Sequence, residues 1–225
     1  MTTQNTSQIS SKEYREVLKT SFVQSYQTSN DAWSYENAMR EVSAYFLECM
    51  SDQKGQHILD IGAGSGKDAE IMLRAGHCVT GIDLYEHEAW QFLNYSWGDK
   101  IHFVKSQFTD WQPSSETTFD AVFDNGCFHH QHPSFYSDYL AHLKALLKPN
   151  GIVMLSVFTP LEENTDGSFI KFDEGRIGHS FSADELRQLL TNQGFIWLDS
   201  RRIYRPWHKH YLPVHYLAAL VKNQD

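Results

Sequence analysis

The sequence contains few cysteines and no long apolar run. Its 225 residues include three cysteines, Cys49, Cys78 and Cys127, without a C-x-x-C pair. So small and odd a set excludes a disulfide framework and is typical of a reducing compartment. No run of about 18 apolar residues occurs, which excludes a membrane-spanning helix, and residues 1–10 lack the apolar core of a secretory signal. We therefore expect a cytoplasmic protein.

Positive charge is also scarce. The 19 lysines and arginines are outnumbered by 28 acidic residues, and the formal net charge is −9. Non-specific affinity for nucleic acid comes from cationic contacts to phosphates, so this composition makes a nucleic-acid partner unlikely. Residues 201–211 are the exception, because they are basic and rich in aromatic side chains. They fit a surface for a nucleic acid or an anionic small molecule, or a solvated edge strand protected by its charges, and the acidic composition favours the edge strand.

A short apolar run followed by a glycine-rich turn organises the chain. Residues 58–61 predict a buried strand, Gly62, Gly64 and Gly66 follow at alternate positions, and residues 68–74 predict a helix. Such a unit directs backbone N–H groups and the positive end of a helix at a ligand. The dinucleotide fingerprint G-x-G-x-x-G is not met, because Lys67 stands at its third glycine position.

Later strand ends carry further candidate ligands. Residues 78–84 predict a second strand, which places Asp83 about twenty residues after the loop, where nucleotide-binding folds bind ribose hydroxyls with a carboxylate. Residues 101–104 predict a third strand, followed directly by Ser106 and Gln107, with Asp110 further on.

A histidine-containing segment follows the fourth predicted strand, at residues 119–123. It includes Asp124, Cys127, His129 and His130, and the carboxyl ends of parallel strands are where ligands bind. An imidazole suits proton removal because its ordinary pKa is near 6.5, so His129 and His130 are candidate general bases, followed by Asp124 and then His132. The alternative is that both line a pocket without titrating. No cysteine or acidic spacing completes a four-ligand set, so no metal site is predicted.

The order of these motifs resembles that of class I methyltransferases that depend on S-adenosyl-L-methionine (SAM). The resemblance covers about residues 56–158, from Asp60-x-Gly62-x-Gly64-x-Gly66 to a Leu-Leu-Lys-Pro-Asn-Gly turn before a strand at 152–158. Residues 124–129 also resemble the thiopurine/thiol branch. The resemblance implies a Rossmann-like α/β fold with a seven-stranded, mostly parallel sheet, an antiparallel last strand and helices on both faces. It implies SAM as cofactor, with S-adenosyl-L-homocysteine (SAH) as product, bound by Asp60, Gly62, Ala63, Gly64, Gly66, Asp83, Leu84, Gln107 and Asp124.

The remaining segments complete a prediction of one domain over residues 1–225. Helices at 12–23 and 32–50 form a cap within residues 1–54, and the core occupies residues 55–225. Further helices are predicted at 86–95, 134–147 and 183–192, and a long polar loop at 159–180 is a candidate lid. Residues 195–204 and 214–222 predict two final strands in an antiparallel hairpin, although the second stretch also suits a helix.

The predicted function is methyl transfer from SAM to a small-molecule acceptor. Candidate acceptor-binding residues are Trp33, Cys127, His129 and Arg176, with Tyr35, Arg40, Phe169 and Phe172 as further neighbours of the ligand. Two alternatives stay open: a methyltransferase acting on RNA or protein, and a non-catalytic protein that binds SAM or a nucleotide. The sequence indicates neither the acceptor atom nor the oligomeric state, since a fold does not specify them.

Overall fold

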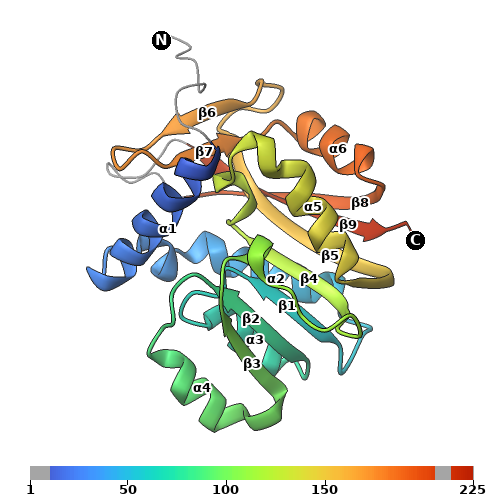
Figure 1. Cartoon of the computed structure of the whole chain (residues 1–225). Coiled ribbons are helices and arrows are strands. Elements are labelled where there is room, and N and C mark those ends of the chain that lie inside the picture. Colours follow the sequence, from blue (N-terminus) through green and yellow to red (C-terminus); the bar gives the residue numbers. More distant parts are fainter. Residues whose placement is uncertain (1–10, 206–213, 225) are drawn as a thin grey trace.

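A single twisted sheet carries the structure, with helices on both faces (Figure 1). The computed structural model describes residues 11–205 and 214–224, and within these ranges the sheet has nine strands. The strands are β1 (His57–Ile61), β2 (Cys78–Asp83), β3 (Ile101–Lys105), β4 (Phe119–Asn125), β5 (Leu147–Pro160), β6 (Ser168–Lys171), β7 (Ile177–Ser180), β8 (Phe195–Ile203) and β9 (Val214–Asn223). The α-helices are α1 (Ser11–Gln27), α2 (Asn37–Cys49), α3 (Lys67–Arg74), α4 (Ala89–Trp97), α5 (Tyr136–Ala145) and α6 (Ala183–Asn192). Short 3-10 helices are η1 (Ala32–Tyr35), η2 (Gly98–Lys100), η3 (Phe108–Asp110), η4 (Phe128–His130) and η5 (Pro133–Phe135).

The strand order confirms the expected Rossmann-like arrangement. Strands β3, β2, β1, β4 and β5 are parallel neighbours in that order, and β9 runs antiparallel between β5 and β8. The final segment is therefore a strand and not a helix. The chain order reverses between β1 and β4, and ligands of such sheets bind in the crevice at this reversal.

The sheet has two strands more than the seven expected. The sequence predicts a loop at 159–180, whereas the structure contains the antiparallel hairpin β6–β7 there. Strand β7 joins β5 through Phe158 and Ser180, two residues beyond the last pairing of β4 with β5. Each hairpin strand has only four residues, and their glycine and polar side chains conceal the alternation that marks a strand.

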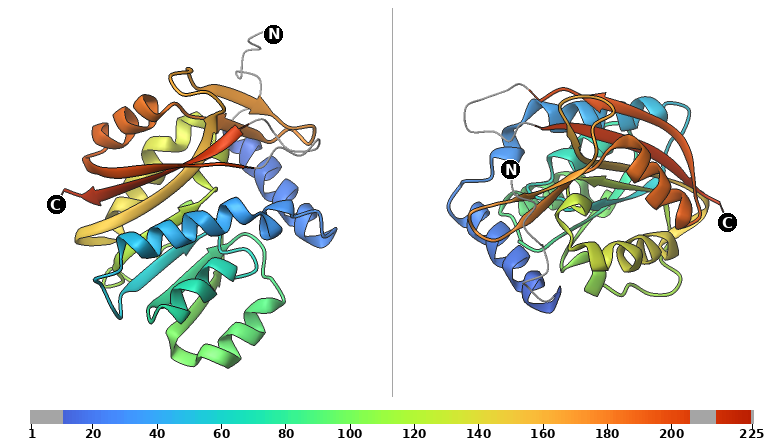
Figure 2. Two further views of the ribbon diagram at one scale, coloured as in Figure 1. Left: turned by 180° about the vertical axis from the view of Figure 1, so that it is seen from behind. Right: turned by 90° about the horizontal axis from the view of Figure 1, so that it is seen from above.

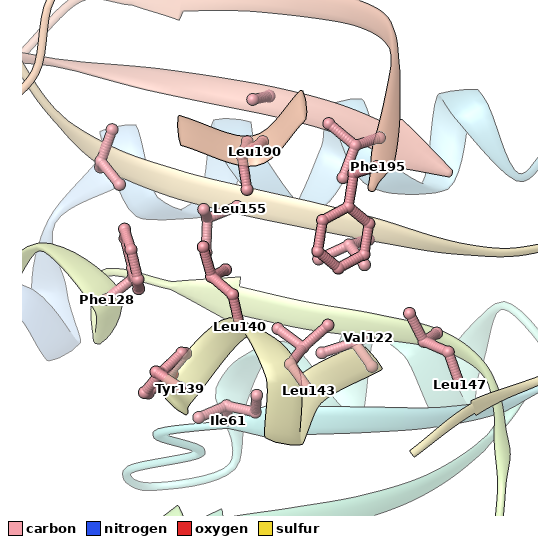
Figure 3. Close-up of a cluster of buried hydrophobic side chains, with 14 of the residues drawn as sticks. Ile61, Val122, Phe128, Tyr139, Leu140, Leu143, Leu147, Leu155, Leu190 and Phe195 are labelled. Carbon is pink, nitrogen blue, oxygen red and sulfur yellow. The ribbon is translucent and has the colours of Figure 1, made fainter. Parts of the chain in front are cut away.

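Two hydrophobic cores lie on opposite faces of the sheet. Successive residues of a strand belong to different cores. Leu59 and Val122 pack with α5 and α6, whereas Ile58 and Phe123 pack with α2 and α3. Figure 3 shows side chains of α5, including Leu140 and Leu143, directed at the strands beneath them. Alternation of this kind follows from the period of two in a strand, and it fixes the register that places the strand ends.

Helices α1 and η1 lie over the carboxyl ends of the parallel strands, whereas α2 packs on one face of the sheet. Helix α1 lies beside the β6–β7 hairpin (Figure 2), where the Tyr14 hydroxyl donates to the His130 carbonyl at 2.7 Å and accepts from the Ile177 N–H at 3.0 Å. The helix predicted at 32–50 is divided into η1 and α2, because Glu36 between them is extended, with φ −80° and ψ 121°. The Glu36 carboxylate binds Arg205 and the Tyr216 hydroxyl, and this distant contact outweighs local helix propensity.

The basic stretch at 201–211 is only partly described. Its first residues finish β8, which pairs with β9 alone at the edge of the sheet. There Arg201 binds both carboxylate oxygens of Glu48, at 2.9 and 3.0 Å. The rest of the stretch, from residue 206 to 211, lies outside the described residues.

Candidate functional site

A cavity of about 270 Å³ opens at the carboxyl ends of the parallel strands. It has two sides. The glycine-loop side consists of Gly62, Ala63, Gly64, Ser65, Asp83 and Leu84, with Ser106 and Gln107 next to it. The aromatic side consists of Phe22, Trp33, His129, His130, Phe158, Phe172, Arg176 and Tyr216. Most residues predicted to bind a ligand therefore line one space: Trp33, Gly62, Ala63, Gly64, Asp83, Leu84, Gln107, Cys127, His129, His130 and Arg176.

The glycine loop needs glycine for both conformation and space. Gly62 and Gly64 have positive φ values of +75° and +53°, which L-residues with a Cβ rarely adopt. A Cβ on Gly62 would meet Cys127 Sγ at 2.0 Å, and one on Gly64 would meet the Tyr26 hydroxyl at 2.8 Å. The loop differs from the sequence interpretation in one respect, because most of its N–H groups bind the protein itself. Gly62 and Ala63 both donate to the Ile82 carbonyl.

Asp83, at the end of β2, holds the loop and faces the cavity. Its Oδ2 accepts from the Gly64 N–H at 2.9 Å, and its Oδ1 accepts from the Tyr85 N–H at 3.0 Å. Burial raises the pKa of Asp83 to about 6. Each carboxylate oxygen accepts more than one hydrogen bond, so Asp83 retains capacity for two adjacent hydroxyl groups of a ligand.

A buried polar cluster lines the cavity near the glycine loop. Asp68 accepts from Arg40 Nη2 at 3.0 Å, from Asn125 Nδ2 at 3.3 Å and from the Ser43 hydroxyl. Within the described residues, Arg40 Nε and Nη1 and Asn125 Oδ1 have no hydrogen-bond partner. Buried polar atoms are normally satisfied, so these donors and this acceptor fit a ligand that carries a carboxylate and an ammonium group.

Three residues predicted to bind the cofactor, Asp60, Gly66 and Asp124, are not among the residues that line the cavity. Their direct contact with the cofactor stays a prediction. Asp124 accepts from the Cys127 N–H at 2.8 Å and the Tyr139 hydroxyl at 2.6 Å, which anchors the segment after β4. Gly66 caps α3 at φ +81°, where a Cβ would meet Leu93 at 2.4 Å. Asp60 is 2% exposed, and burial together with the Asp68 carboxylate raises its pKa well above the usual value.

The residues that follow β3 add polar groups to the lining of the cavity. Gln107 Nε2 donates to Thr109 Oγ1 at 3.2 Å, which orients the amide and leaves its carbonyl oxygen as an acceptor. Ser106 and Phe108 line the cavity beside it. An amide oxygen next to an aromatic ring suits a flat ligand with an amino group at its edge.

The two histidines of η4 are buried and electrostatically disfavoured as cations. His130 Nδ1 lies 2.8 Å from the Ile177 carbonyl, so that nitrogen carries the proton of a neutral ring. Burial and the Arg176 charge lower the pKa of His130 to about 3. Burial, followed by His130, lowers the pKa of His129 well below its usual value. A ring that binds a proton so weakly is a poor match for a general base near neutral pH.

Several residues of the aromatic side carry no signal in the sequence. Phe22 belongs to α1, Phe158 to β5 and Tyr216 to β9, and no spacing relates these three positions. Arg205 also lines the cavity, at 5.6 Å from the Phe158 ring centroid. Tyr26 stacks on Tyr85 at 5.2 Å, above the glycine loop. The tertiary fold alone brings these residues together.

The described residues contain neither a group of metal ligands nor a membrane-spanning helix. Within residues 11–205 and 214–224, no three His, Cys, Asp or Glu side chains group so as to hold a metal ion. In the same ranges, no helix has both the length and the apolar character needed to cross a bilayer. The prediction of a cytoplasmic location stays a prediction.

A full-length relative among the solved structures is an enzyme from Burkholderia thailandensis. This 1,6-didemethyltoxoflavin-N1-methyltransferase was crystallised with 1,6-didemethyltoxoflavin and SAH. It is 36% identical to this chain and superposes with a TM-score of 0.89, over 98% of this chain and 93% of that chain. The likeness therefore includes the glycine loop, the β6–β7 hairpin and the final strands.

Matches to curated proteins are shorter. The tRNA U34 carboxymethyltransferase of Hahella chejuensis is 32% identical over 121 residues, which are 52% of this chain and 36% of that protein. The ubiquinone biosynthesis O-methyltransferase of Vibrio campbellii is 30% identical over 117 residues, which are 50% of this chain and 48% of that protein. The chain thus spans between about a third and a half of these relatives.

A family model described as a methyltransferase domain matches residues 33–198, which include β1 to β7, the start of β8 and the whole glycine-loop side of the cavity. This match and the full-length relative agree with the strand order, the glycine loop and the position of Asp83. The chain belongs to the class I SAM-dependent methyltransferase family and is an enzyme.

Proposed function

We propose that this enzyme transfers the methyl group of SAM to a nitrogen atom of a small, planar acceptor. The observation that carries the proposal is the cavity itself, in which the glycine-loop side and the aromatic side share one space. A cofactor on the first side and a ring on the second would lie next to each other, and such proximity is the main requirement for methyl transfer.

The glycine-loop side fits the groups of SAM. Asp83 accepts the ribose hydroxyls, and the Gln107 carbonyl accepts the adenine amino group. Arg40 binds the carboxylate through its unsatisfied donors, while Asn125 Oδ1 and Asp68 face the ammonium. SAM supplies an electrophilic methyl group on a sulfonium whose departure needs no assistance, and the chain supplies orientation.

The aromatic side supports a flat acceptor. His129 lies 3.8 Å from the Phe158 ring centroid, and His130 lies 5.6 Å from that of Phe172. Aromatic faces bind planar rings by stacking and edge contacts. Transfer to nitrogen is inferred from the B. thailandensis relative, whose name specifies N1 of 1,6-didemethyltoxoflavin. His129 and His130 then contact the acceptor as neutral rings, in place of the predicted role as general bases.

A tRNA acceptor is the second candidate, because four matched relatives are tRNA U34 carboxymethyltransferases. These matches cover 32–36% of the relatives' own length, so regions of those proteins have no counterpart in the match. The net charge of −9 disfavours a phosphate backbone. A small molecule remains the better-supported acceptor.

The test separates cofactor binding from acceptor choice. Calorimetric titration of SAM, SAH and NAD into the wild type should show binding of the first two only. The Asp83→Ala variant should lose about ten- to several-hundred-fold in affinity, since hydrogen bonds to a charged group contribute about 1.5–3 kcal/mol each. The exposed Asp99→Ala variant serves as control.

Methyl transfer from labelled SAM is then compared for 1,6-didemethyltoxoflavin and tRNA. Transfer to the small molecule that is insensitive to salt supports the proposal. Transfer to tRNA that falls steeply between low and moderate salt supports the second candidate and contradicts the first.

A further inference from the structure

We propose that the enzyme binds its acceptor as an anion and that Arg176 stabilises this anion. The inference rests on the proposed methyl transfer to a small planar molecule, and it adds the acceptor's charge state and chemical class. The acceptor would be a ring whose acidic N–H adjoins a carbonyl group. Loss of that proton spreads negative charge over the nitrogen and the carbonyl oxygen.

Arg176 is a buried cation on the aromatic side of the cavity. It directly precedes β7 and is 7% exposed. Its Nε donates to Glu174 Oε1 at 3.2 Å, and its Nη2 lies 3.0 Å from the same oxygen in an ion pair. Its Nη1 forms no hydrogen bond to any residue in the described part of the chain. This donor is available to an oxygen of the acceptor, and charge-assisted bonds of this kind are strong.

Aromatic rings hold the guanidinium in place. Its central carbon lies 4.5 Å from the Phe22 ring centroid, 4.4 Å from that of Phe172 and 5.9 Å from that of Trp33. These cation–π contacts come from α1, the hairpin and η1, so three separate segments fix one charge. A charge fixed before binding stabilises an anion without reorganisation of the protein.

The charged and titratable neighbours of Arg176 leave its positive charge directed at the cavity. On its own hairpin, Glu174 is 39% exposed and so is partly screened by solvent. From α1 and η4, Tyr14 and His130 face it, and both are neutral at neutral pH. Burial and, after it, the Arg176 charge lower the pKa of His130, the ring beside it at this wall.

Among the described residues of the aromatic side, none is suited to take a proton from the acceptor. His129 and His130 have lowered pKa values, and the Glu36 carboxylate is bound by Arg205 and Tyr216. Asp68 and Asp83 belong to the opposite part of the cavity and are engaged there. The acceptor must then lose its proton to solvent, and an adjacent cation favours that loss.

The transfer step balances without a base. The lone pair of the anionic nitrogen forms the new N–C bond while the C–S bond of the sulfonium breaks and its electron pair stays on sulfur. The anion and the sulfonium thus become a neutral N-methyl product and a neutral thioether. After this step Arg176 faces a neutral product in place of the acceptor anion, which favours release of the product.

The experiment measures acceptor binding in the presence of SAH, so no turnover occurs. The probe is 1,6-didemethyltoxoflavin, and its 1,6-dimethylated analogue, which lacks both of those N–H groups, is the uncharged control ligand. Binding is titrated from pH 5 to 9 with the wild type, Arg176→Gln and Arg176→Lys. Arg187→Gln is the control variant, because Arg187 is an exposed arginine that contacts Trp197 outside the cavity.

The wild type should lower the pKa of the bound probe by about one to two units, which corresponds to about 10- to 100-fold tighter binding of the anion. Arg176→Gln should abolish this shift, Arg176→Lys should retain part of it, and Arg187→Gln should match the wild type. The dimethylated analogue should bind the wild type and Arg176→Gln within about threefold.

An unchanged shift in Arg176→Gln, or preferential binding of the neutral probe by the wild type, would overturn the inference. If SAH binds and the probe does not, the inference fails while the assignment of the cofactor side stands. If SAH itself does not bind, the proposed function fails and the inference falls with it. Thermal melting of each variant separates these outcomes from misfolding.

Discussion

The two sides of the cavity are built in different ways. The glycine-loop side comes from consecutive strand ends, so its main residues lie between Gly62 and Gln107 and are bonded to one another through backbone groups. The aromatic side combines α1, η1, η4, the β6–β7 hairpin and β9, which are distant in sequence. A local motif therefore encodes the cofactor side, whereas tertiary contacts assemble the acceptor side.

Long-range polar contacts close the aromatic side. Glu36 and Arg205 are separated by 169 residues, and both are 8% exposed. Tyr14 and Ile177 are separated by 163 residues and connect α1 to the hairpin. We therefore expect that loss of such a contact lowers acceptor affinity most, while changes in the glycine loop lower SAH affinity most.

The largest expected effect is that of Glu36→Gln. The substitution removes the carboxylate charge that binds the buried Arg205 guanidinium, and breaking a buried pair costs about 3–5 kcal/mol. The free energy of unfolding, measured by urea denaturation, should fall by that amount. At temperatures where the variant stays folded, acceptor affinity should fall more than SAH affinity.

A matched control is a second Glu–Arg pair nearby in the sequence. Glu48 and Arg201 connect α2 to β8 with good geometry, but their side chains are 64% and 46% exposed. Glu48→Gln should leave stability almost unchanged, because solvent screens such pairs. If Glu36→Gln and Glu48→Gln lower the free energy of unfolding equally, burial does not explain the contribution of the Glu36–Arg205 pair.

Gly62→Ala tests the cofactor side. The new Cβ meets Cys127 Sγ, and the residue must also keep its positive φ. Overpacking of about 1–3 kcal/mol adds to a left-handed backbone cost of about 1–2 kcal/mol. Stability and SAH affinity should both fall, with acceptor contacts affected only indirectly.

Two further variants divide that loss into its parts. Gly76 also has a positive φ, of +94°, but has no neighbour within 4 Å of an added Cβ, so Gly76→Ala measures the backbone cost alone. Gly62→Ala combined with Cys127→Ala removes the sulfur and should recover the overpacking part. Failure of this recovery would show that the contact with Cys127 does not limit the loop.

The same contrast explains what the sequence could predict. Gly62, Gly64 and Asp83 are predictable because their spacing follows directly from strand, turn and helix geometry. Phe22, Arg205 and Tyr216 are not, because nothing local distinguishes them from ordinary core or surface residues. The hairpin was predicted as a loop since Gly178 and the polar residues around it give no strand pattern, and the break at Glu36 depends on a partner 169 residues away.

The smallest predicted effect is the pH dependence of SAH affinity, which tests the cofactor side of the cavity alone. Asp83 has a pKa of about 6 because it is buried, and a protonated carboxyl accepts the hydroxyl groups of a ligand less well. SAH affinity should therefore be constant above about pH 7 and fall by up to about tenfold per pH unit below 6. Calorimetric titration at pH 5, 6, 7 and 8 measures this, and Asp83→Asn should show a flatter profile.

The free energy of unfolding should change with pH in the direction opposite to SAH affinity, and this contrast identifies Asp83 as the titrating group. An acid whose pKa is raised by folding binds its proton more tightly in the folded state. Above pH 6 the ionised Asp83 therefore lowers the free energy of unfolding. This penalty becomes smaller as the pH falls towards 4. Between pH 6 and 4, the wild type without ligand should therefore gain stability relative to Asp83→Asn while its SAH affinity declines. His129 and His130 stay neutral over this range. Burial also raises the pKa of Asp124 to about 6, but Asp124 is present in both proteins, so the difference between the wild type and Asp83→Asn reports on Asp83. A parallel decline in both quantities would place the titrating group elsewhere.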